Sequence, residues 1–579
     1  MSAERVSFGY PASEPGPARS RSHMTARSPS IALLALGTAL AAFAGCGSDH
    51  PSPAPAHVVW TDGGFDDWTG VPAAASDPSG DAPRGAPVDF GAVFVQDDPR
   101  FIHLLIDLGD TVTAQGMPGS VEIVLDGDAD PGTGGSYGGV EGADLAVVLS
   151  RQWDSAADAR GAGAGVRRIG ADGPDEIESA SAVGLLVSPT HSSDRFEVRL
   201  DRLMVRDWLA KRPDLSDAAA GSEPPSETAA GTRLAGRLRH MQAGAVADET
   251  PVFAHTLATA PGEPPPLLGA DAVARAPGAL RVVTWNVSDG HFRDRPEAFR
   301  RVLAALDPDV ILLDEVYAEA TMADLERFSG DRAAGGGPSW GWWLARGGGR
   351  QRTAVGARAT ELRGEAGLAR IDHPPGALER WLREVGDEPE FPRMAPPAVL
   401  ARAEADGGLS ATGAWMDAGD NSVLFVPVDL QSAGYDGSPR DRLRELQART
   451  LNRAVAAALA RRPDAGLVIG GDLNLVGSAR PLDELRSGLG AGGGDLDVVR
   501  VQRLRDRSLA TWRSTRAGDP FSPGRLDHVL YRASVLRVER AFVFDAADLS
   551  PAAIKQLRIR ESDTRQSDHF PLVVDFAFR

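Results

Sequence analysis

The segment AGLVIGGDLN at residues 465–474 decides the fold class of the C-terminal half of the chain. It is a short apolar run that ends in two glycines, Asp472 and Asn474. The segment before it, 440–461, has the apolar period of a helix, so a helix leads into a buried strand. Upstream, a strand, a helix and a strand are expected at 280–287, 296–307 and 310–316. This alternation is typical of sheets covered by helices.

Polar side chains stand at the ends of these apolar strands. A buried strand does not tolerate such groups unless they are paired or serve a site. The residues are Asn286, Glu315, Asp472, Asn474, Asp527, Asp568 and His569. Because several of them are carboxylates and one is a histidine, we expect a catalytic or metal-binding site where the strand ends meet.

Five motifs in chain order carry these residues. They are Thr284-Trp285-Asn286, Pro308-Asp309-Val310 leading to Asp314-Glu315-Val316, Gly471-Asp472-Leu473-Asn474, Gly524-Arg525-Leu526-Asp527-His528 and Ser567-Asp568-His569. Together they resemble the endonuclease/exonuclease/phosphatase superfamily. The resemblance implies an α+β fold for residues 280–579, namely a four-layer αββα sandwich with the active site at one end of its two sheets.

The resemblance also implies a divalent cation, Mg²⁺ or Mn²⁺. Glu315 is the main expected ligand, with Asn286 and Asp568 close to the same ion. A cluster of bare carboxylates would repel an anionic phosphate ester, whereas a bound divalent cation reverses the local field.

Catalytic roles follow from the same resemblance. Asp472 is expected to orient or deprotonate the attacking water, and Asn474 to hydrogen-bond a phosphate oxygen. His569 is expected to lie against the phosphate, oriented by Asp527 through its other ring nitrogen. The protonated imidazole would offset negative charge in the transition state.

One position departs from the family pattern. Most hydrolytic relatives carry a histidine at the end of the strand that precedes the Asp472 motif, and this chain places Asp429 there. A carboxylate cannot supply the proton or the positive charge of an imidazole. Asp429 could bind a second metal, orient water or mark a protein that has lost activity. Asp314 departs as well, because a glutamine is usual before the metal-binding glutamate.

The segment ARGGGRQR at residues 345–352 is the expected substrate-facing element outside these motifs. A glycine-rich backbone with Arg350 and Arg352 suits a phosphate. An exposed hairpin turn explains the same composition.

Charge is distributed unevenly along the chain. The formal net charge is −19, yet residues 281–579 carry 41 basic and 43 acidic side chains. A protein that grips long nucleic acids normally has a strongly basic face. The composition therefore favours a substrate other than a long nucleic acid.

The first residues have the features of a bacterial lipoprotein signal. Residues 31–45 form an uncharged apolar run after basic residues, too short to span a membrane comfortably. Cys46, the only cysteine of the chain, follows at the position where the resembling lipobox motif is lipidated. We expect a signal peptide at 1–45, a tether at 46–56 and a protein anchored in the cell envelope through lipid alone. One cysteine excludes disulfides and multi-thiolate metal sites.

Between the tether and the C-terminal domain lies a segment that we call the N-terminal module (57–259). Its short apolar runs, separated by Gly, Asp and Pro, predict an all-β sandwich. With its motifs at 62–68 and 126–147 it resembles family 9 carbohydrate-binding modules, which implies a polysaccharide ligand stacked on Trp60, Trp68 or Trp153. A linker is expected at 260–279 and the C-terminal domain at 280–579.

An acidic loop in this module has two interpretations. Asp126, Asp128 and Asp130 occupy alternate positions, which can turn carboxylates toward one Ca²⁺ ion. The twelfth position of this loop is a tyrosine, which excludes an EF-hand. A solvated acidic turn is the other interpretation.

Two functional hypotheses result. The first is a monomeric, metal-dependent hydrolase of phosphoric esters, of the nuclease or phosphodiesterase type, at the bacterial cell envelope. The alternative is a catalytically degenerate surface protein that binds its ligand through the N-terminal module.

Overall fold

A computed structural model describes residues 58–127, 130, 132–151, 161–211, 231–288, 290–329, 340–358, 362–390, 394–515 and 519–579. The predicted signal peptide and tether, with Cys46, lie outside the described residues, as do Asp128 and Trp153. Residues 56–579 form one compact unit. Within the described ranges, none of the helices combines the length and apolarity needed to cross a membrane.

The C-terminal domain contains a six-stranded and a seven-stranded sheet. The first has the order β18 (Gly341–Leu344), β19 (Gln351–Ala357), β17 (Val310–Tyr317), β16 (Leu280–Asn286), β28 (Leu572–Phe578) and β27 (Leu536–Val543). The second has the order β20 (Leu362–Gly364), β22 (Ala414–Ala418), β23 (Asn421–Asp429), β24 (Gly466–Asp472), β26 (Asp527–Tyr531) and β25 (Asp497–Val498), with β21 (Ser410–Ala411) beside β23. The pairs β16–β17 and β23–β24 are parallel, so their carboxyl ends lie at the same edge of each sheet.

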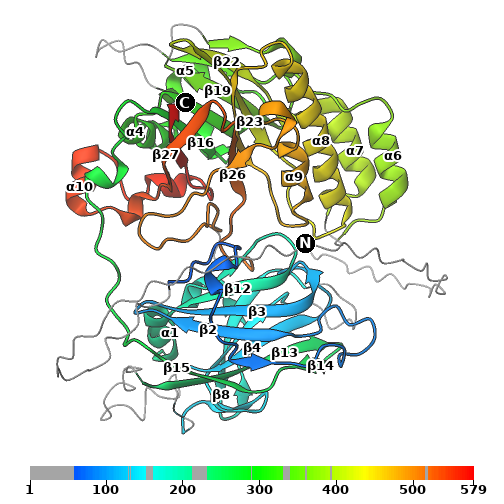
Figure 1. Cartoon of the computed structure of the whole chain (residues 1–579), viewed down its shortest axis with the longest axis vertical. Coiled ribbons are helices and arrows are strands. Elements are labelled where there is room, and N and C mark those ends of the chain that lie inside the picture. Colours follow the sequence, from blue (N-terminus) through cyan, green and yellow to red (C-terminus); the bar gives the residue numbers. More distant parts are fainter. Residues whose placement is uncertain are drawn as a thin grey trace, which may run out of the picture. The chain divides into compact units, whose positions relative to one another are not determined.

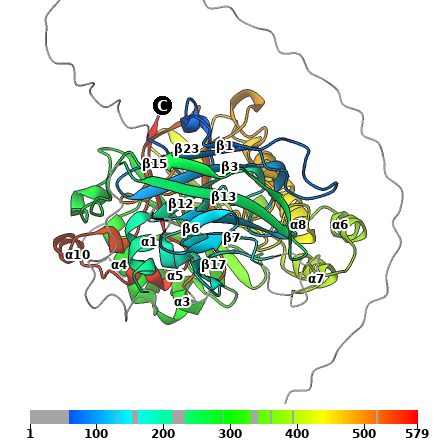
Figure 2. The same ribbon diagram turned by 90° about the horizontal axis from the view of Figure 1, so that it is seen from below.

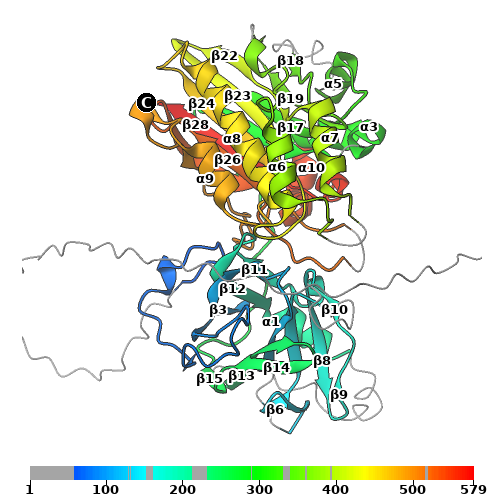
Figure 3. The same cartoon turned by 90° about the vertical axis from the view of Figure 1, so that its right-hand side faces the viewer.

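The helices of this domain cover the outer faces of both sheets (Figures 1 and 3). They are α3 (Gly290–Asp294), α4 (Pro296–Leu306), α5 (Met322–Ser329), α6 (Ala377–Val385), α7 (Pro397–Gly407), α8 (Pro439–Leu459), α9 (Arg480–Arg486) and α10 (Pro551–Leu557). The predicted helix at 440–461 is α8, which begins where Ser438 Oγ accepts a hydrogen bond from Asp441 N at 3.3 Å.

Three apolar cores define the layers of the domain. Phe299 of α4 packs with Ile311 on one side of the six-stranded sheet, and Leu451 of α8 packs with Ile469 on the outer side of the seven-stranded sheet. A third core, which includes Leu312, joins the two sheets face to face. This order of layers is consistent with the predicted αββα sandwich.

The N-terminal module also contains two sheets (Figure 2). One has the order β1 (Ala75–Ser76), β2 (Ala92–Asp97), β3 (Phe101–Val112), β12 (Ser193–Asp201) and β11 (Leu186–Ser188). The other has the order β10 (Glu178–Ser179), β8 (Ala164–Gly170), β7 (Leu145–Leu149), β4 (Ser120–Asp126), β13 (Arg233–Gln242) and β14 (Ala245–Glu249), with β15 (Phe253–Thr256) and β9 (Gly173–Pro174) at its margins. A separate pair joins β5 (Gly135–Tyr137) to β6 (Val140–Ala143).

An apolar core lies between the two larger sheets of the module. It joins Leu104 and Val198 of one sheet to Ile123 and Val147 of the other. Helix α1 (Arg202–Leu209), which the apolar pattern did not predict, begins where Asp201 accepts hydrogen bonds from two backbone amides of its first turn.

Candidate active site

Glu315 stands at an irregularity near the end of β17. The pairing of β17 with β19 shifts register between Leu313 and Val316, and Glu315 has a φ of +52°, in the left-handed region. Its neighbour Asp314 is fully buried and accepts a hydrogen bond from Asp472 N of the other sheet at 3.3 Å. The bulge thus separates two consecutive acids: Asp314 joins the sheets, while Glu315 lines a cavity.

Three aspartates form a row across adjacent strands of the seven-stranded sheet. Asp429 of β23 is in register with Asp472 of β24, and Asp472 is in register with Asp527 of β26. Gly471 is required beside this row, because its φ is +148° and a Cβ there would lie 1.9 Å from the carbonyl oxygen of Val428. The glycine before Asp472 is therefore a steric necessity.

The amide of Asn474 is fixed beside this row. Its backbone N–H donates to Asp472 Oδ1 at 2.8 Å, and its Nδ2 donates to Leu430 O at 2.8 Å and to Asp429 Oδ1 at 3.4 Å. These contacts assign Asp429 a position from which it orients Asn474.

His569 lies between two of the three aspartates. Its Nδ1 is 2.8 Å from Asp527 Oδ2, and its Nε2 is 3.6 Å from Asp472 Oδ2. Burial alone would lower the pKa of His569, but the carboxylates of Asp527 and Asp472 outweigh burial and raise this pKa well above its ordinary value. Both carboxylates thus favour the protonated form of the imidazole, and its Nδ1 faces Asp527.

Asp568 is oriented by two donors that the sequence motifs did not identify. Ser288 Oγ donates to Asp568 Oδ1 at 2.8 Å, and Trp512 Nε1 donates to Asp568 Oδ2 at 3.1 Å. Ser288 N also donates to the buried Asn286 at Oδ1, at 3.0 Å. A serine or a tryptophan in a loop has no spacing signal, so only the folded chain reveals these contacts.

A cavity of about 600 Å³ gathers most of the predicted site residues. Its lining includes Glu315, Arg350, Asp429, Asp472, Asn474, Asp568 and His569. Asn286 and Asp527 are buried behind this lining. A cavity of this volume matches the size of small-molecule sites.

Arg352 does not fit its predicted role as a phosphate ligand. Its guanidinium donates to the carbonyl oxygens of Ala318 and Ala320, both at 3.1 Å, and to that of Ala345. These bonds hold the turn between β18 and β19 together, so Arg352 has a structural role. Of the two predicted phosphate-binding arginines, Arg350 is the one that lines the cavity.

The donor set of the cavity fits a hard divalent cation. Burial, followed by repulsion between neighbouring carboxylates, raises the pKa of Asp314 and Asp429, and that of Asp472 reaches about 7. Burial also raises the pKa of Glu315, an effect that Asn286 and His569 oppose. Oxygen donors crowded under mutual repulsion are stabilised by a bound cation, and Mg²⁺ and Mn²⁺ prefer such ligands. The residues that would hold it are Glu315, Asn286 and Asp568.

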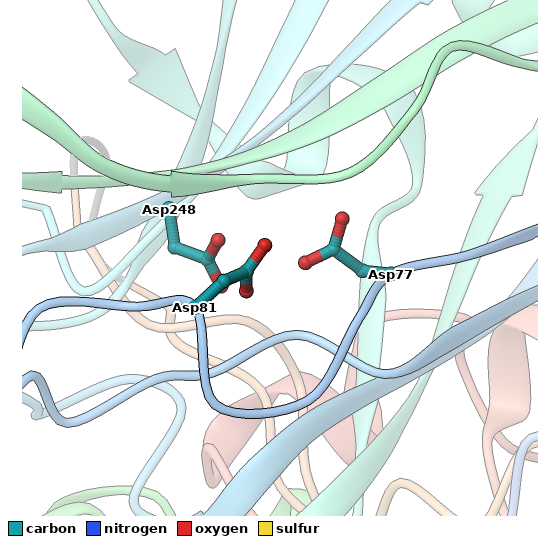
Figure 4. A group of neighbouring side chains, drawn as sticks. All are labelled: Asp77, Asp81 and Asp248. Atoms are coloured by element: carbon teal, nitrogen blue, oxygen red, sulfur yellow. The ribbon is translucent and has the colours of Figure 1, made fainter.

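A separate acidic group lies in the N-terminal module. The carboxylates of Asp77, Asp81 and Asp248 have oxygens within 4.8 Å of one another (Figure 4). Burial, with help from neighbouring acids, raises the pKa of Asp77 to about 6. The predicted calcium loop is elsewhere: Asp126 is buried at the end of β4, and Asp130 follows it. With Asp128 outside the described residues, calcium binding there stays a prediction.

The tryptophans proposed for sugar stacking have other surroundings. Trp68 is 4% exposed and donates from Nε1 to Glu197 at 2.9 Å. The ring of Trp60 faces the guanidinium groups of Arg500 and Arg507. The buried ring of Trp68 is not an open stacking surface, and sugar binding by the module stays a prediction.

Comparison with known proteins agrees with this geometry. Residues 283–569 match the model of the Endonuclease/Exonuclease/phosphatase family. This part of the chain is an endonuclease/exonuclease/phosphatase domain. No curated protein sequence gives a significant match to the chain.

The solved structures that match this chain at low similarity include the following three. The human Nocturnin catalytic domain with bound sulfate is 15% identical over 53% of this chain and 97% of its own, with a TM-score of 0.33. The 3′ phosphatase NExo from Neisseria bound to product DNA hairpin is 17% identical over 52% and 100%, with a TM-score of 0.32. A mannosyl-6-phosphatase from Bacteroides thetaiotaomicron is 15% identical over 52% and 100%, with a TM-score of 0.32.

Proposed function

We propose that the chain is a divalent-metal-dependent hydrolase of phosphoric esters, of the nuclease or phosphodiesterase type. One observation carries the proposal: His569, paired with Asp527, faces Asp472 in a cavity that Glu315 and Asp568 also line. A general base, a cationic acid and a set of hard metal ligands thus converge on one small space.

The residues have distinct roles in this proposal. A cation held by Glu315, Asn286 and Asp568 supplies Lewis acidity and neutralises phosphate charge. Asp472 accepts the proton of the attacking water, since its raised pKa of about 7 suits a base at neutral pH. His569 donates a hydrogen bond from Nε2 to a phosphate oxygen and offsets developing negative charge.

The contact of Asp429 with Asn474 is consistent with an active enzyme in which Asp429 orients that amide. In the alternative, a degenerate surface protein, Asp429 stands in place of a catalytic histidine that has been lost. The His569–Asp527 pair at 2.8 Å favours the enzyme, because this pair costs stability to bury and has no purpose in a pure binding protein.

Turnover of bis-p-nitrophenyl phosphate by the purified full chain with Mg²⁺ tests the proposal. We expect activity that chelation abolishes, and that His569→Ala and Glu315→Ala each reduce by about 10²-fold or more. Glu297→Ala, on the exposed face of α4, is the control with unchanged activity. Equal rates in all four proteins would favour the binding-protein alternative.

We also propose that Cys46 is lipidated and anchors the enzyme outside the cytoplasmic membrane. The support is its position after the apolar run 31–45 and its uniqueness in the chain. Metabolic labelling with an alkyne fatty acid, compared between the wild type and Cys46→Ser, tests this. Retention on insoluble polysaccharides tests the sugar-binding prediction for the N-terminal module.

A further inference from the structure

The catalytic cavity is lined by two parts of the chain that are distant in sequence. Beside the residues of the C-terminal domain, five residues of the N-terminal module line it: Thr113, Gln115, Gly116, Ala162 and Thr190. The C-terminal domain supplies all the predicted catalytic groups, so the contribution of the module is to the shape of the cavity.

Gln115 of the module forms hydrogen bonds with the loop at the rim of the cavity that contains Ser522. Its Nε2 donates to Ser522 Oγ at 3.1 Å, and its Oε1 accepts from Ser522 N at 3.0 Å. Both residues line the cavity, and Ser522 is 2% exposed. A two-way amide contact of this kind fixes orientation as well as distance.

The same loop of the module contacts a second rim loop, the one that follows Asp429. Asp436 N donates to Thr113 Oγ1 at 3.0 Å, and a Cβ placed on Gly116 would lie 3.6 Å from Cβ of Tyr435. Residues 113–116 therefore connect the two rim loops that flank the catalytic groups.

Two further hydrogen bonds join the N-terminal module to the C-terminal domain. Ala164 N donates to Pro520 O at 2.6 Å, and Thr190 Oγ1 donates to Arg525 O at 3.0 Å. A Cβ placed on Gly524 would lie only 2.4 Å from Cγ2 of Thr190. The two surfaces are packed without space for a polymer between them at this point.

A buried ion pair holds the two parts together further from the cavity. Arg199 of β12 donates to the carbonyl oxygen of Asp506 at 3.1 Å and lies 3.5 Å from its carboxylate. Despite burial, the charges of Arg199 and Arg503 lower the pKa of Asp506 well below its ordinary value. The pair is therefore charged, and separating it would expose two ions that the structure satisfies internally.

From these contacts we propose that the N-terminal module is one wall of the catalytic cavity and restricts the enzyme to compact phosphoesters, excluding internal bonds of duplex DNA. This inference rests on the proposed function. A cavity of about 600 Å³ with the module as one wall holds a small ester, whereas a duplex requires a groove that is open along the catalytic groups. The charge of the module favours the same restriction, because residues 57–259 carry 15 basic and 32 acidic side chains and repel a polyanion.

A comparison of two substrates, each incubated with the full chain, tests the proposed restriction to compact phosphoesters. With Mg²⁺, we expect turnover of bis-p-nitrophenyl phosphate and no nicking of covalently closed plasmid DNA under the same conditions. Plasmid nicking at a comparable rate per enzyme would overturn the inference and leave the proposed function intact. Absence of turnover with any ester would instead contradict the proposed function.

A steric variant tests whether the wall faces the substrate. Ala162→Phe adds bulk to the cavity from the module side, and we expect kcat/KM for bis-p-nitrophenyl phosphate to fall by about 10-fold or more. Ala245→Phe places the same side chain on the exposed strand β14 and serves as the matched control with unchanged kcat/KM. Equal kcat/KM values for Ala162→Phe and Ala245→Phe would contradict the proposal that the module contacts the substrate.

A disulfide cross-link tests the contact between the N-terminal module and the C-terminal domain without an activity measurement. A Cβ on Gly524 would lie 3.8 Å from Cβ of Thr190, which suits a disulfide. In full chain carrying Cys46→Ser, we expect Thr190→Cys with Gly524→Cys to form an intramolecular disulfide under mild oxidation, detected by peptide mass. Each single cysteine is the control. Failure of the folded double variant to cross-link would overturn the inference.

Discussion

Nδ1 of His569 lies 2.8 Å from Oδ2 of Asp527; Asp527 is the first residue of β26 in the seven-stranded sheet, and His569 lies in the loop before β28 of the six-stranded sheet. Asp527 is 1% exposed and His569 is 4% exposed. The contact therefore joins the ends of both sheets in a region of low water access. It fixes which nitrogen of the imidazole faces the cavity. The dependence of activity on Asp527 can therefore be measured.

Asp527→Asn should reduce kcat by about 10²–10⁴-fold with a small change in KM. An amide cannot stabilise the imidazolium, so His569 loses its charge and its orientation while the cavity keeps its shape. Steady-state kinetics on bis-p-nitrophenyl phosphate measures this. Asp417→Asn, at an exposed pair with Arg363, is the matched control, and a similar kcat in both variants would contradict the role of the pair.

Glu315→Gln should weaken Mn²⁺ binding by about 10²-fold or more, because it removes the charge of the proposed principal ligand while keeping its shape. Calorimetric titration of the full chain with Mn²⁺ measures the affinity directly. Glu297→Gln, on the exposed face of α4, should leave it unchanged. Undiminished affinity in Glu315→Gln would place the cation elsewhere.

Glu197 should make stability depend on pH. Burial raises the pKa of Glu197 to about 8, although Trp68 and the backbone amides of Gly63 and Asp62 oppose the rise. Below its ordinary pKa, both folded and unfolded chains hold the proton. Between that value and about 8 only the folded chain holds it, so stability falls as pH rises through this window, by an amount on the order of a few kcal/mol.

Glu197→Gln should remove most of this slope, because an amide does not titrate. Urea midpoints of the full chain at pH 5, 6.5 and 8 compare the wild type with this variant and with the exposed control Glu141→Gln. Parallel curves for the wild type and Glu197→Gln would show that the carboxyl stays ionised in the folded protein.

Arg281→Met should destabilise the C-terminal domain by about 3–5 kcal/mol, because it leaves the buried carboxylate of Asp575 without its cation. The guanidinium donates to Asp575 at 2.6 and 2.9 Å and to the carbonyl oxygens of Val273 and Leu306, both at 2.9 Å. Thermal unfolding followed by circular dichroism measures the loss. Arg363→Met breaks an exposed pair and should cost less than about 1 kcal/mol; equal losses would contradict the argument.

Local pattern was sufficient for the five elements that were predicted in the C-terminal domain. The helix expected at 440–461 is α8 at Pro439–Leu459, and the strand expected at 310–316 is β17 at Val310–Tyr317. Apolar period and capping residues act over a few positions, so the sequence shows them directly. Helix α1 was missed because its eight residues follow a strand within a β-rich segment.

Some site residues were likewise identified from the sequence, and the roles of others were not. The motifs name His569, Asp472 and Glu315 because each stands at or beside one end of an apolar strand. They do not separate Arg350, which lines the cavity, from Arg352, which binds carbonyl oxygens. The sequence by itself therefore determined the class of the C-terminal domain and the identity of its chemical groups, since both depend on short-range order.

Only the tertiary structure decided what surrounds those groups. The support of Asp568 by Trp512 spans 56 positions, and the contact of Gln115 with Ser522 spans 407. Neither residue type is unusual at its position, and no periodicity links such distant segments. Contacts of this kind arise from how whole surfaces pack, and packing is a property of the folded chain.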